Sequence, residues 1–557
     1  MDKDLSKASR LRNRLAHQED QKHGFDLVAI ALSSLGFKWV AGVGGTPVYQ
    51  IFQACSRQHL KVIDTHTQAC AVLMAASSAW VAGRPVGAAI LSAGPAITNA
   101  MTGILVARDN GWPLIVLGGR RALDQGRGAF QALDGAALIK PIAKWTTCVE
   151  DASAIPPLIQ KALQIACSGR PGPVYLDLPE DVLLARANAK GNIPPLQPEQ
   201  CQPKYRNIED TACRLIGAKQ PVLILGDSLR WSADQERARS ALKQSGLTVI
   251  PLPLLRGLIP EETPADIISP RQRAKLLSLA DLVILLGCGL DWRLRFGAEI
   301  KTEVPIIAID EGLYPLADQM RQPEQIEANS GAFLDQLLDK LESLGFCSVK
   351  KELKNTAGTS SPEPANSGIS ALTESVAFSI IQSHMPAKSF LVLDGSVVLS
   401  AGQHSIPRSD PFAILDPGWN GCIGTGLPFA LGAKIESGTD PVVLCTGDFA
   451  FGFNMIELEA SIRHHLPLYI FLLNNGGPIG RSNQFKPHSS SNPIHAYPSD
   501  LAYHQISNAL GMRSFLATDA PQLHKACRSV FNHGSAAFVH IMMAPTSCGH
   551  PSDLVQA

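Results

Sequence analysis

The sequence lacks the features that mark several large classes of protein. Its 557 residues include 49 basic and 49 acidic side chains, so no excess of one charge points to nucleic acid or a membrane surface. No uninterrupted apolar run approaches the length of a membrane span. The twelve cysteines contain no CxxC pair, which argues against a zinc or disulfide framework and favours buried thiols in a reducing compartment.

The N-terminal stretch, residues 1–22, lacks an apolar segment and is rich in charge. This composition predicts a flexible arm rather than a secretory signal. We therefore expect a cytoplasmic protein with a small-molecule substrate, and neither nucleic acid nor a membrane as a partner.

Short apolar runs that alternate with helical stretches are the main feature that is present. With 45% apolar and 18% charged residues, the chain has enough core for several compact domains. The pattern predicts an α/β protein with three doubly wound domains and mostly parallel sheets. The strand-like runs are 39–43, 61–65, 86–94, 113–119 and 172–179, then 221–227, 248–253, 281–287 and 304–310, and finally 391–396, 441–445 and 466–474.

Proline-rich and Ser/Pro-rich tracts separate these groups of strands. They predict a boundary after each of the first two domains. The expected parts are the arm 1–22, a first domain 23–190, a middle domain 205–345, a linker 346–368, a third domain 369–545 and a tail or lid 546–557.

One stretch of the third domain, TGDFAFGFNMIELEASIRHHLPLYIFLLNNGG (446–477), reads as a strand, a loop, an amphipathic helix and a second strand. The carboxyl ends of parallel strands meet at one edge of a sheet, so Asp448 should lie near Asn474 and Asn475. A carboxylate, an amide oxygen and a carbonyl of the following GG form a hard-oxygen set suited to magnesium or calcium. A diphosphate would supply the remaining ligands.

Asp448 and Asn475 stand 27 positions apart, and this spacing resembles the thiamin-diphosphate (ThDP) motif, which runs from GDG to NN. The resemblance implies that magnesium is held by Asp448, Asn475 and the Gly477 carbonyl, with Ala450 facing the diphosphate. Phe449 departs from the motif because it occupies the third glycine of GDG. The backbone conformation at Phe449 is therefore in question.

Two further stretches of the third domain resemble the same superfamily. In LVLDGS (391–396) a strand ends at small residues, which places Asp394, Gly395 and Ser396 against the cofactor. The stretch GWNGCIGTGLPFALGAK (418–434) resembles the family's glycine-rich turn. It implies that the Gly421 carbonyl and the Ile423 amide bond the aminopyrimidine, while the Ile423 side chain props the cofactor into a V shape.

The first domain carries a second departure at the residue closest to the chemistry. The family has a glutamate that drives the imino tautomer of the aminopyrimidine and so generates the ylide. The flanks IDT (63–65) and AGRP (82–85) place Gln68 there, and a one-residue slip would place Thr67 there instead. Neither is a carboxylate, so neither can carry a proton at neutral pH. The turn SAGPAITNA (92–100) also resembles the family and adds Asn99 to the cofactor contacts.

Several stretches resemble the branch that contains 2-hydroxyacyl-CoA lyase and oxalyl-CoA decarboxylase, and 51–65 resembles benzaldehyde lyase. At two substrate-facing positions the oxalyl-CoA enzymes carry tyrosine, where this chain has Phe130 and Ile479. We take both as candidate catalytic-site residues from which a hydroxyl has been lost.

The middle domain raises the question of a second ligand. Some members of the branch bind ADP or CoA there through basic residues. The candidates in this chain are Arg256, Arg273 and Lys275, with Asp310 at a strand end suited to a ribose. The stretch GCGLDWRLRFG (287–297) has a single GxG, which is weak support for a dinucleotide loop.

The resemblance covers roughly residues 24–545 and implies an enzyme of the decarboxylase and acetolactate-synthase type. The implied activity is a C–C lyase or carboligase that acts on a 2-keto acid, a 2-hydroxyacyl-CoA or an acyloin through an ylide and an enamine. A homodimer or homotetramer is implied, because the family builds its site between two subunits. Two alternatives are a catalytically silent ThDP-binding paralogue with a regulatory role and a nucleotide-binding module.

Overall fold

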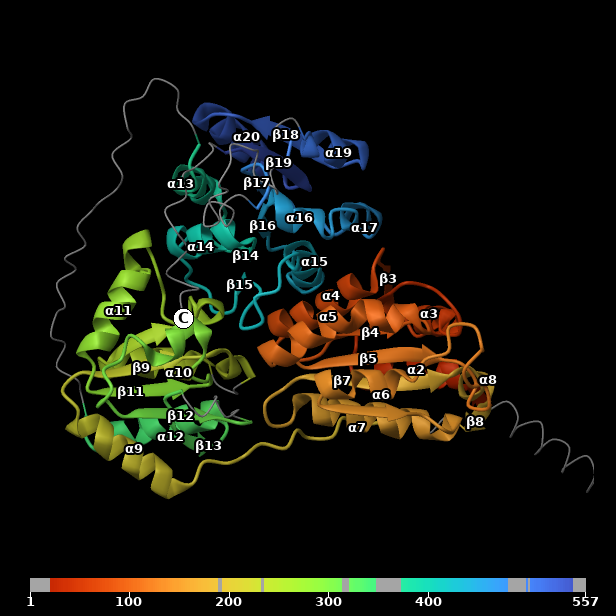
Figure 1. The fold of residues 1–557 in the computed structure, drawn as a ribbon, viewed down its shortest axis with the longest axis horizontal. Coiled ribbons are helices and arrows are strands. Elements are labelled where there is room, and N and C mark those ends of the chain that lie inside the picture. The colour runs from red at the N-terminus through yellow and green to blue at the C-terminus, as the bar shows by residue number, and fades with distance from the viewer. Residues whose placement is uncertain are drawn as a thin grey trace, which may run out of the picture. The chain divides into compact units, whose positions relative to one another are not determined.

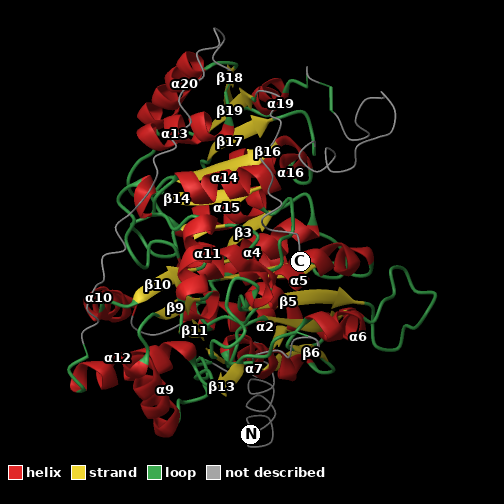
Figure 2. Ribbon diagram, turned by 60° about the vertical axis from the view of Figure 1, so that its left-hand side comes forward, coloured by secondary structure: helices red, strands yellow, loops and turns green. Residues whose placement is uncertain are grey.

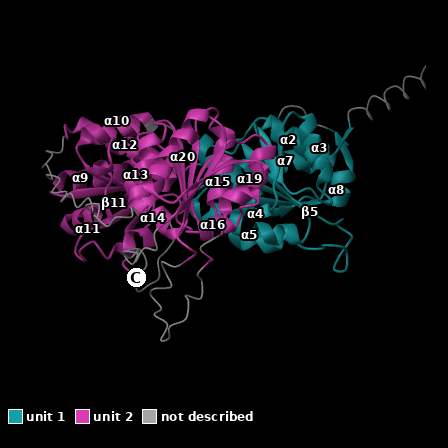
Figure 3. Cartoon of the chain, turned by 90° about the horizontal axis from the view of Figure 1, so that it is seen from above, with its two compact units in different colours: residues 1–199 teal, residues 200–557 magenta. Residues whose placement is uncertain are grey.

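The computed structural model describes residues 21–188, 193–231, 235–312, 320–346, 372–478, 497–498 and 501–543. The chain divides into two compact units, Met1–Glu199 and Gln200–Ala557, which Figure 3 shows in two colours. Within the described ranges, no helix has both the length and the apolar character needed to cross a membrane. The predicted linker (except Phe346), the C-terminal tail and Ile479 lie outside the described residues.

Unit 1 is built on a six-stranded parallel sheet with helices on both faces (Figure 1). Unit 1 as a whole has eight strands within the described residues, and β1 and β8 form a separate pair. The strands are β1 (Gln21–His23), β2 (Trp39–Gly42), β3 (Lys61–Asp64), β4 (Gly87–Leu91), β5 (Leu114–Arg120), β6 (Trp145–Cys148), β7 (Pro173–Pro179) and β8 (Arg186–Asn188). Its helices are α2 (Gly24–Ser34), α3 (Tyr49–Arg57), α4 (Gln68–Ala82), α5 (Pro95–Asn110), α6 (Gly135–Ile139), η1 (Lys140–Ile142), η2 (Ala152–Ala154), α7 (Ile155–Cys167) and α8 (Glu180–Leu184).

The sheet of unit 1 has the order β3-β2-β4-β5-β7-β6, and every neighbouring pair is parallel. Helices α4 and α5 pack together on one face of the sheet. Helices α2, α3 and α7 share a continuous apolar core with the opposite face. The doubly wound fold is therefore confirmed. The sequence missed β6, a half-buried edge strand with no apolar run, and the antiparallel pair of β1 with β8. Gln21 and Lys22, expected in the arm, belong to that pair.

Unit 2 contains two more parallel sheets, of five and six strands, whose strands Figure 2 shows in yellow. The first has strands β9 (Pro221–Leu225), β10 (Thr248–Pro251), β11 (Leu282–Leu286), β12 (Ile306–Asp310) and β13 (Glu324–Glu327), with α9 (Tyr205–Gly217), η3 (Asp227–Trp231), α10 (Gln235–Ser245), η4 (Pro253–Leu255), η5 (Pro264–Asp266), α11 (Pro270–Leu279), η6 (Trp292–Gly297) and α12 (Ser330–Ser343). The second has β14 (Phe390–Asp394), β15 (Ile414–Leu415), β16 (Val442–Gly447), β17 (Tyr469–Asn474), β18 (Arg513–Ala517) and β19 (Ala537–Met542), with α13 (Glu374–His384), α14 (Ser396–Ser405), α15 (Gly426–Glu436), α16 (Asp448–Gly452), α17 (Glu457–Arg463), α19 (Tyr503–Ala509) and α20 (Ala520–His533).

The orders of these sheets are β10-β9-β11-β12-β13 and β15-β14-β16-β17-β19-β18, again with parallel neighbours only. Strands such as β11 and β17 are buried along their whole length, because helices cover both faces of a parallel sheet. This burial is why they read as unbroken apolar runs. The sequence missed β13, β15, β18 and β19. Of these, β13 is a polar edge strand and β15 has only two residues.

A buried ion pair of the middle domain, between Arg256 and Glu261, is hydrogen-bonded to the third domain. Arg256 lies after η4 in the middle domain, and its Nη2 donates to the Ile406 carbonyl at 2.7 Å, beyond α14 of the third domain. The Gln403 carbonyl accepts from Nη1, and Glu261 accepts from the Arg408 amide at 3.0 Å. These hydrogen bonds connect the ion pair of the middle domain to the backbone of the third domain.

Replacing Arg256 by Met should strongly destabilise unit 2. The substitution leaves the Glu261 carboxylate buried without its cation, and breaking a buried pair in this way costs about 3–5 kcal/mol. Urea unfolding followed by circular dichroism measures the change. The matched control is Arg237→Met, because Arg237 forms an exposed pair with Asp339 in the same domain and should contribute little. Equal losses in the two variants would contradict this role of Arg256.

Candidate cofactor site

The loops after β14 and β16 follow neighbouring strands at the carboxyl edge of the third-domain sheet. These strands are neighbours, but the chain leaves β14 toward β15 on one side and continues from β16 to β17 on the other. Ligands of open α/β sheets bind at such a switch point. Gly395 has φ +91°, and a Cβ on it would lie 3.3 Å from the Gly447 nitrogen and 3.4 Å from the Ala450 Cβ. The two loops therefore approach each other closely.

Asp394 organises the glycine-rich turn at this edge. Its Oδ1 accepts hydrogen bonds from the amides of Gly395 at 2.7 Å and Gly424 at 3.3 Å, and its Oδ2 accepts from the Gly426 amide at 2.7 Å. Burial raises the pKa of Asp394 to about 6, and these three bonds oppose that shift. The side chain thus holds the turn in place. Ser396, the first residue of α14, is exposed.

The turn that carries Gly421 and Ile423 is fixed from both domains of unit 2. Gly424 has φ +85°, and a Cβ there would lie 2.5 Å from the Cβ of Phe453, so only glycine fits. On the middle-domain side, Trp292 Nε1 donates to the Trp419 carbonyl at 2.9 Å. Ile423 is half-buried within this turn. The segments that the resemblance assigned to the aminopyrimidine are therefore preorganised.

Asp448 connects the loops that follow β16 and β17. It is 2% exposed at the first position of α16, and its Oδ2 accepts from the Gly477 amide at 2.6 Å. Its Oδ1 accepts from the Phe449 amide at 2.8 Å. Burial raises the pKa of Asp448, and the amide bonds counter part of the rise. The structure thus brings Asp448 together with the Asn475 to Gly477 segment, as the spacing predicted.

The question raised by Phe449 is answered by its backbone. Phe449 is the second residue of α16 and has no positive φ, so the missing glycine causes no strain. Its half-buried ring packs edge-to-face on Phe453, with centroids 5.5 Å apart, and lies 6.3 Å from the ring of Tyr497. The side chain thus adds an aromatic wall beside the Asp448 loop.

In unit 1 the structure brings Gln68 together with Asn99. The side-chain NH₂ of Asn99, on α5, donates to Oε1 of Gln68, the first residue of α4, at 2.6 Å. Thr67, the alternative position for the missing glutamate, caps α4 by accepting from the Cys70 amide at 3.2 Å. Both side chains are therefore engaged in local hydrogen bonds. Neither position offers a carboxylate.

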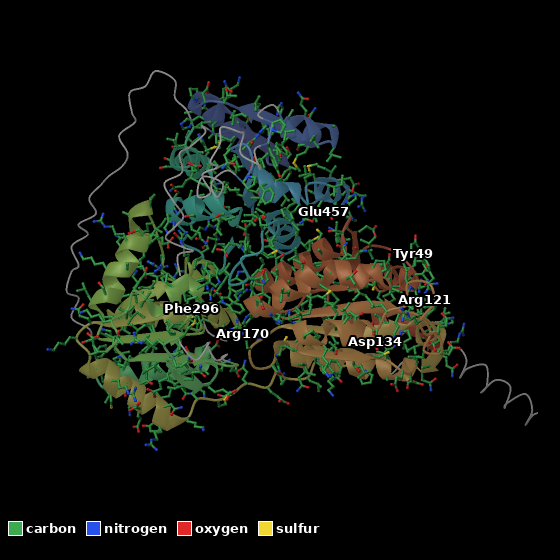
Figure 4. The ribbon with its side chains drawn as sticks, in the orientation of Figure 1. Tyr49, Arg121, Asp134, Arg170, Phe296 and Glu457 are labelled. Carbon is green, nitrogen blue, oxygen red and sulfur yellow. The ribbon has the colours of Figure 1, made fainter. Side chains whose placement is uncertain are left out.

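Phe130 lies in the exposed loop between β5 and α6 and is itself 70% exposed. The Arg121 guanidinium, labelled in Figure 4, lies 5.2 Å from the ring centroid, and its Nε donates to the Phe130 carbonyl at 2.6 Å. Arg121 also pairs with Glu180 at 3.0 Å. The Phe130 ring, expected from the sequence to take the place of a tyrosine of the oxalyl-CoA enzymes, thus packs against the Arg121 cation.

The basic residues suggested for a nucleotide are largely committed to other partners. Arg256 is buried against Glu261, as described above, and Arg273 pairs with Glu299 at 3.2 Å. Lys275 is exposed. Asp310 is 2% exposed and its Oδ2 accepts from Ser228 at 2.8 Å.

The switch point of the middle-domain sheet, between β9 and β11, is also filled with charged side chains. Arg293 donates there to Asp227 at 2.5 Å and to Asp291 at 2.8 Å. The geometry therefore gives the nucleotide-binding hypothesis no support.

Sequence reasoning missed a polar group beneath the Asn475 to Gly477 segment. His540 of β19 is 1% exposed and lies 2.9 Å from Asn474 through Nε2, and its Nδ1 lies 3.1 Å from His504 Nδ1. Burial, together with the smaller effect of the neighbouring His504, lowers the pKa of His540 to about 4. A lone histidine inside the apolar run AFVHIM was the available signal.

Comparisons with known proteins identify the class to which these sheets and loops belong. Three family models match: the N-terminal TPP binding domain of thiamine pyrophosphate enzymes over residues 22–138, the central domain over 208–337 and the C-terminal TPP binding domain over 395–541. Thiamine pyrophosphate is another name for ThDP. The chain belongs to the ThDP-dependent enzymes, with all three of their domains.

The curated relatives are distant and align over nearly the whole chain. The chain is 27% identical to 2-hydroxyacyl-CoA lyase 1 of Mus musculus, over 96% of each chain. It is 25% identical to 2-hydroxyacyl-CoA lyase of Arabidopsis thaliana, over 93% of this chain and 95% of that protein. A probable acetolactate synthase of Mycobacterium bovis is 26% identical, over 94% and 96%.

The third-domain residues fit a diphosphate and its cation. No group of three or more His, Cys, Asp or Glu side chains suited to a metal occurs in the described part of the chain, so any cation here would rely on one carboxylate. Asp448 supplies that carboxylate beside the 475–477 backbone, and a diphosphate supplies further oxygens. Helices α14 and α16 begin at the same edge, where helix N-termini favour negative charge.

Replacing Asp448 by Ala should abolish ThDP binding, because the diphosphate charges lose their bridging cation and the 475–477 segment loses its acceptor. Calorimetric titration of ThDP in the presence of magnesium measures the loss. The control is Asp440→Ala, which removes a carboxylate near the opposite end of the same strand. Unchanged ThDP affinity in Asp448→Ala would contradict the assignment.

Proposed function

We propose that the protein is a ThDP- and magnesium-dependent C–C lyase or carboligase acting on a 2-keto acid, a 2-hydroxyacyl-CoA or an acyloin-type substrate. The observation that carries the proposal is the Asp448 to Gly477 bond, which joins the two loops expected to hold the cation. The names of the relatives, two lyases and a probable acetolactate synthase, support this choice of substrates.

Bound ThDP supplies a carbon nucleophile for carbonyl groups and an acceptor for the electron pair released at the substrate. The residues of this chain bind and orient it. Asp448, Asn475 and the Gly477 carbonyl would hold magnesium, while the Gly421 carbonyl and the Ile423 amide would orient the aminopyrimidine. Gln68 can give that ring only a neutral hydrogen bond, worth about 1 kcal/mol, and cannot move a proton.

The missing carboxylate bears on the type of reaction. A neutral pocket wall disfavours protonation of a carbanion-like centre, which then remains available to a second carbonyl. We therefore propose that carboligation is preferred over simple decarboxylation. Incubation with ThDP and a panel of 2-keto acids and 2-hydroxyacyl thioesters, with products identified by mass spectrometry, tests both statements. If the protein converts no donor in this panel, the proposal that it is an active enzyme is contradicted.

The alternative is a catalytically silent ThDP-binding paralogue with a regulatory role. The observation that favours it is the engagement of Thr67 and Gln68 in local hydrogen bonds, with no acid at either position. Tight ThDP binding without turnover in the substrate panel would select this alternative.

Restoring the acid should restore proton transfer. With Gln68→Glu we expect exchange of the thiazolium C2 proton to accelerate at least tenfold, at the lower end of the about 10²–10⁴-fold that general acid–base catalysis contributes. Deuterium exchange quenched with acid and followed by NMR measures the rate, and the product mixture should shift toward protonated aldehyde.

The matched control for Gln68→Glu is Thr67→Glu, which places the same acid at the alternative position. Acceleration in Thr67→Glu alone would show that Thr67 occupies the glutamate position. Equal rates in the wild type and in both variants would mean that another group already performs the proton transfer.

We also propose a homodimer or homotetramer, because the candidate cofactor residues are divided between two compact units. Sharing the cofactor between chains links its binding to assembly. Dilution below the dissociation constant of the dimer should release ThDP together with activity. Analytical ultracentrifugation with detection of bound ThDP measures both, and a monomer that keeps tight ThDP would contradict the proposal.

A further inference from the structure

Three polar side chains beneath the candidate magnesium site form one chain of hydrogen bonds. His504 on α19, His540 on β19 and Asn474 at the end of β17 are connected by the 2.9 and 3.1 Å contacts given above. The Asn474 Oδ1 then accepts from the Gly476 amide at 3.0 Å, inside the 475–477 segment. The register of β17 with β19, which pairs Leu472 with His540, places these side chains on one face of the sheet.

The direction of every bond in this chain follows from one backbone group. The Gly476 amide can only donate, so the Asn474 oxygen faces it and the Asn474 NH₂ faces His540. Nε2 of the neutral His540 ring must then accept, and its proton lies on Nδ1. That Nδ1–H donates to His504 Nδ1, which leaves the His504 proton on Nε2.

The same histidine also contacts the support of Asp448. The Tyr503 ring packs edge-to-face on His540 with centroids 5.6 Å apart, and Phe451 of α16 lies 6.3 Å from Tyr503 and 5.4 Å from Phe538. Phe451 lies on the helix that Asp448 begins. His540 is therefore linked to both loops that would hold the cation. Asn474 connects it to the 475–477 segment, and the rings of Tyr503 and Phe451 connect it to the helix that Asp448 begins.

We propose that His540 is a positioning residue for the magnesium site, with its Nδ1 proton accepted by His504, so that Asn474 holds the 475–477 segment in the geometry that binds the cation. The proposal rests on the proposed magnesium and ThDP binding. Outer partners that orient metal ligands in this way typically contribute a factor of about 10–100 to metal affinity.

The tautomer can be measured in the protein without any ligand. The full-length wild type, labelled with ¹⁵N only at histidine, should give a ring signal with a protonated Nδ1 and an unprotonated Nε2 that vanishes in His540→Gln. Signals of this kind from His23 and His404, whose Nδ1 atoms face the carbonyls of Leu184 and Ser400, should remain in the variant. A His540 signal with the proton on Nε2 would overturn the inference, because Asn474 then has no acceptor on that ring.

Paired variants separate positioning from packing. The amide oxygen of His540→Gln can replace Nε2 as acceptor for Asn474, whereas His540→Leu fills space without accepting. We expect magnesium affinity at saturating ThDP, measured by calorimetry, to fall about tenfold or more in His540→Leu and to stay close to the wild type in His540→Gln. Equal losses in both, or no loss in His540→Leu, would overturn the inference.

A second pair tests the same chain at the half-buried His504, where folding is at less risk. His504→Asn keeps an acceptor for the Nδ1 proton of His540 and should retain magnesium affinity, whereas His504→Leu removes that acceptor and should weaken magnesium binding. Equal magnesium affinity in His504→Leu and the wild type would show that His504 does not support the position of His540. If the wild type binds no magnesium with ThDP, the proposed function fails as well, whereas retained binding in His540→Leu overturns the positioning role alone.

Discussion

The hydrogen bond from the Gly477 amide to Asp448 is the contact on which the candidate site depends. It ties the end of β16 to the segment after β17, which follows α16, α17 and β17 in the sequence. Because Asp448 is almost fully buried, its carboxylate needs these amide donors when no cation is present. The same oxygens and the neighbouring backbone then form a hard-oxygen set. Under the proposed function, this one side chain would meet both a structural requirement of the fold and a requirement of the cofactor.

The candidate residues of the two units differ in how far they keep the family pattern. In unit 2, Asp394 and Asp448 order the glycine-rich turn and the metal loop entirely through backbone amides, so the side-chain changes at Phe449 and Ile423 leave the framework intact. In unit 1, the change at Gln68 or Thr67 falls on a group that would move a proton. Under the proposed function, we therefore expect ThDP binding and turnover to depend on different residues.

The sequence sufficed for the three sheets and for the pairing of Asp448 with the 475–477 segment, because both follow from strand periodicity and from the common edge of parallel strands. It could not settle the backbone at Phe449, since whether glycine is required depends on a φ angle that no pattern contains. Edge strands such as β6 and β13 were missed because half of their surface faces water and they carry no apolar run.

Contacts between distant residues were also beyond the sequence. Arg256 reads as a surface cation, and only the fold shows that it lies buried against Glu261. The link from His504 through His540 to Asn474 joins side chains from three elements, two of which, β19 and α19, were not predicted. A histidine inside an apolar strand signals a buried polar contact, but the sequence does not name its partner.

The central claim, that unit 2 carries a working binding site for the diphosphate and its cation, can be tested on the unmodified protein. Calorimetric titration of the wild type with ThDP should show saturable binding in magnesium that disappears when EDTA removes the cation. Binding that is equally tight in EDTA, or no binding in magnesium, would contradict the account.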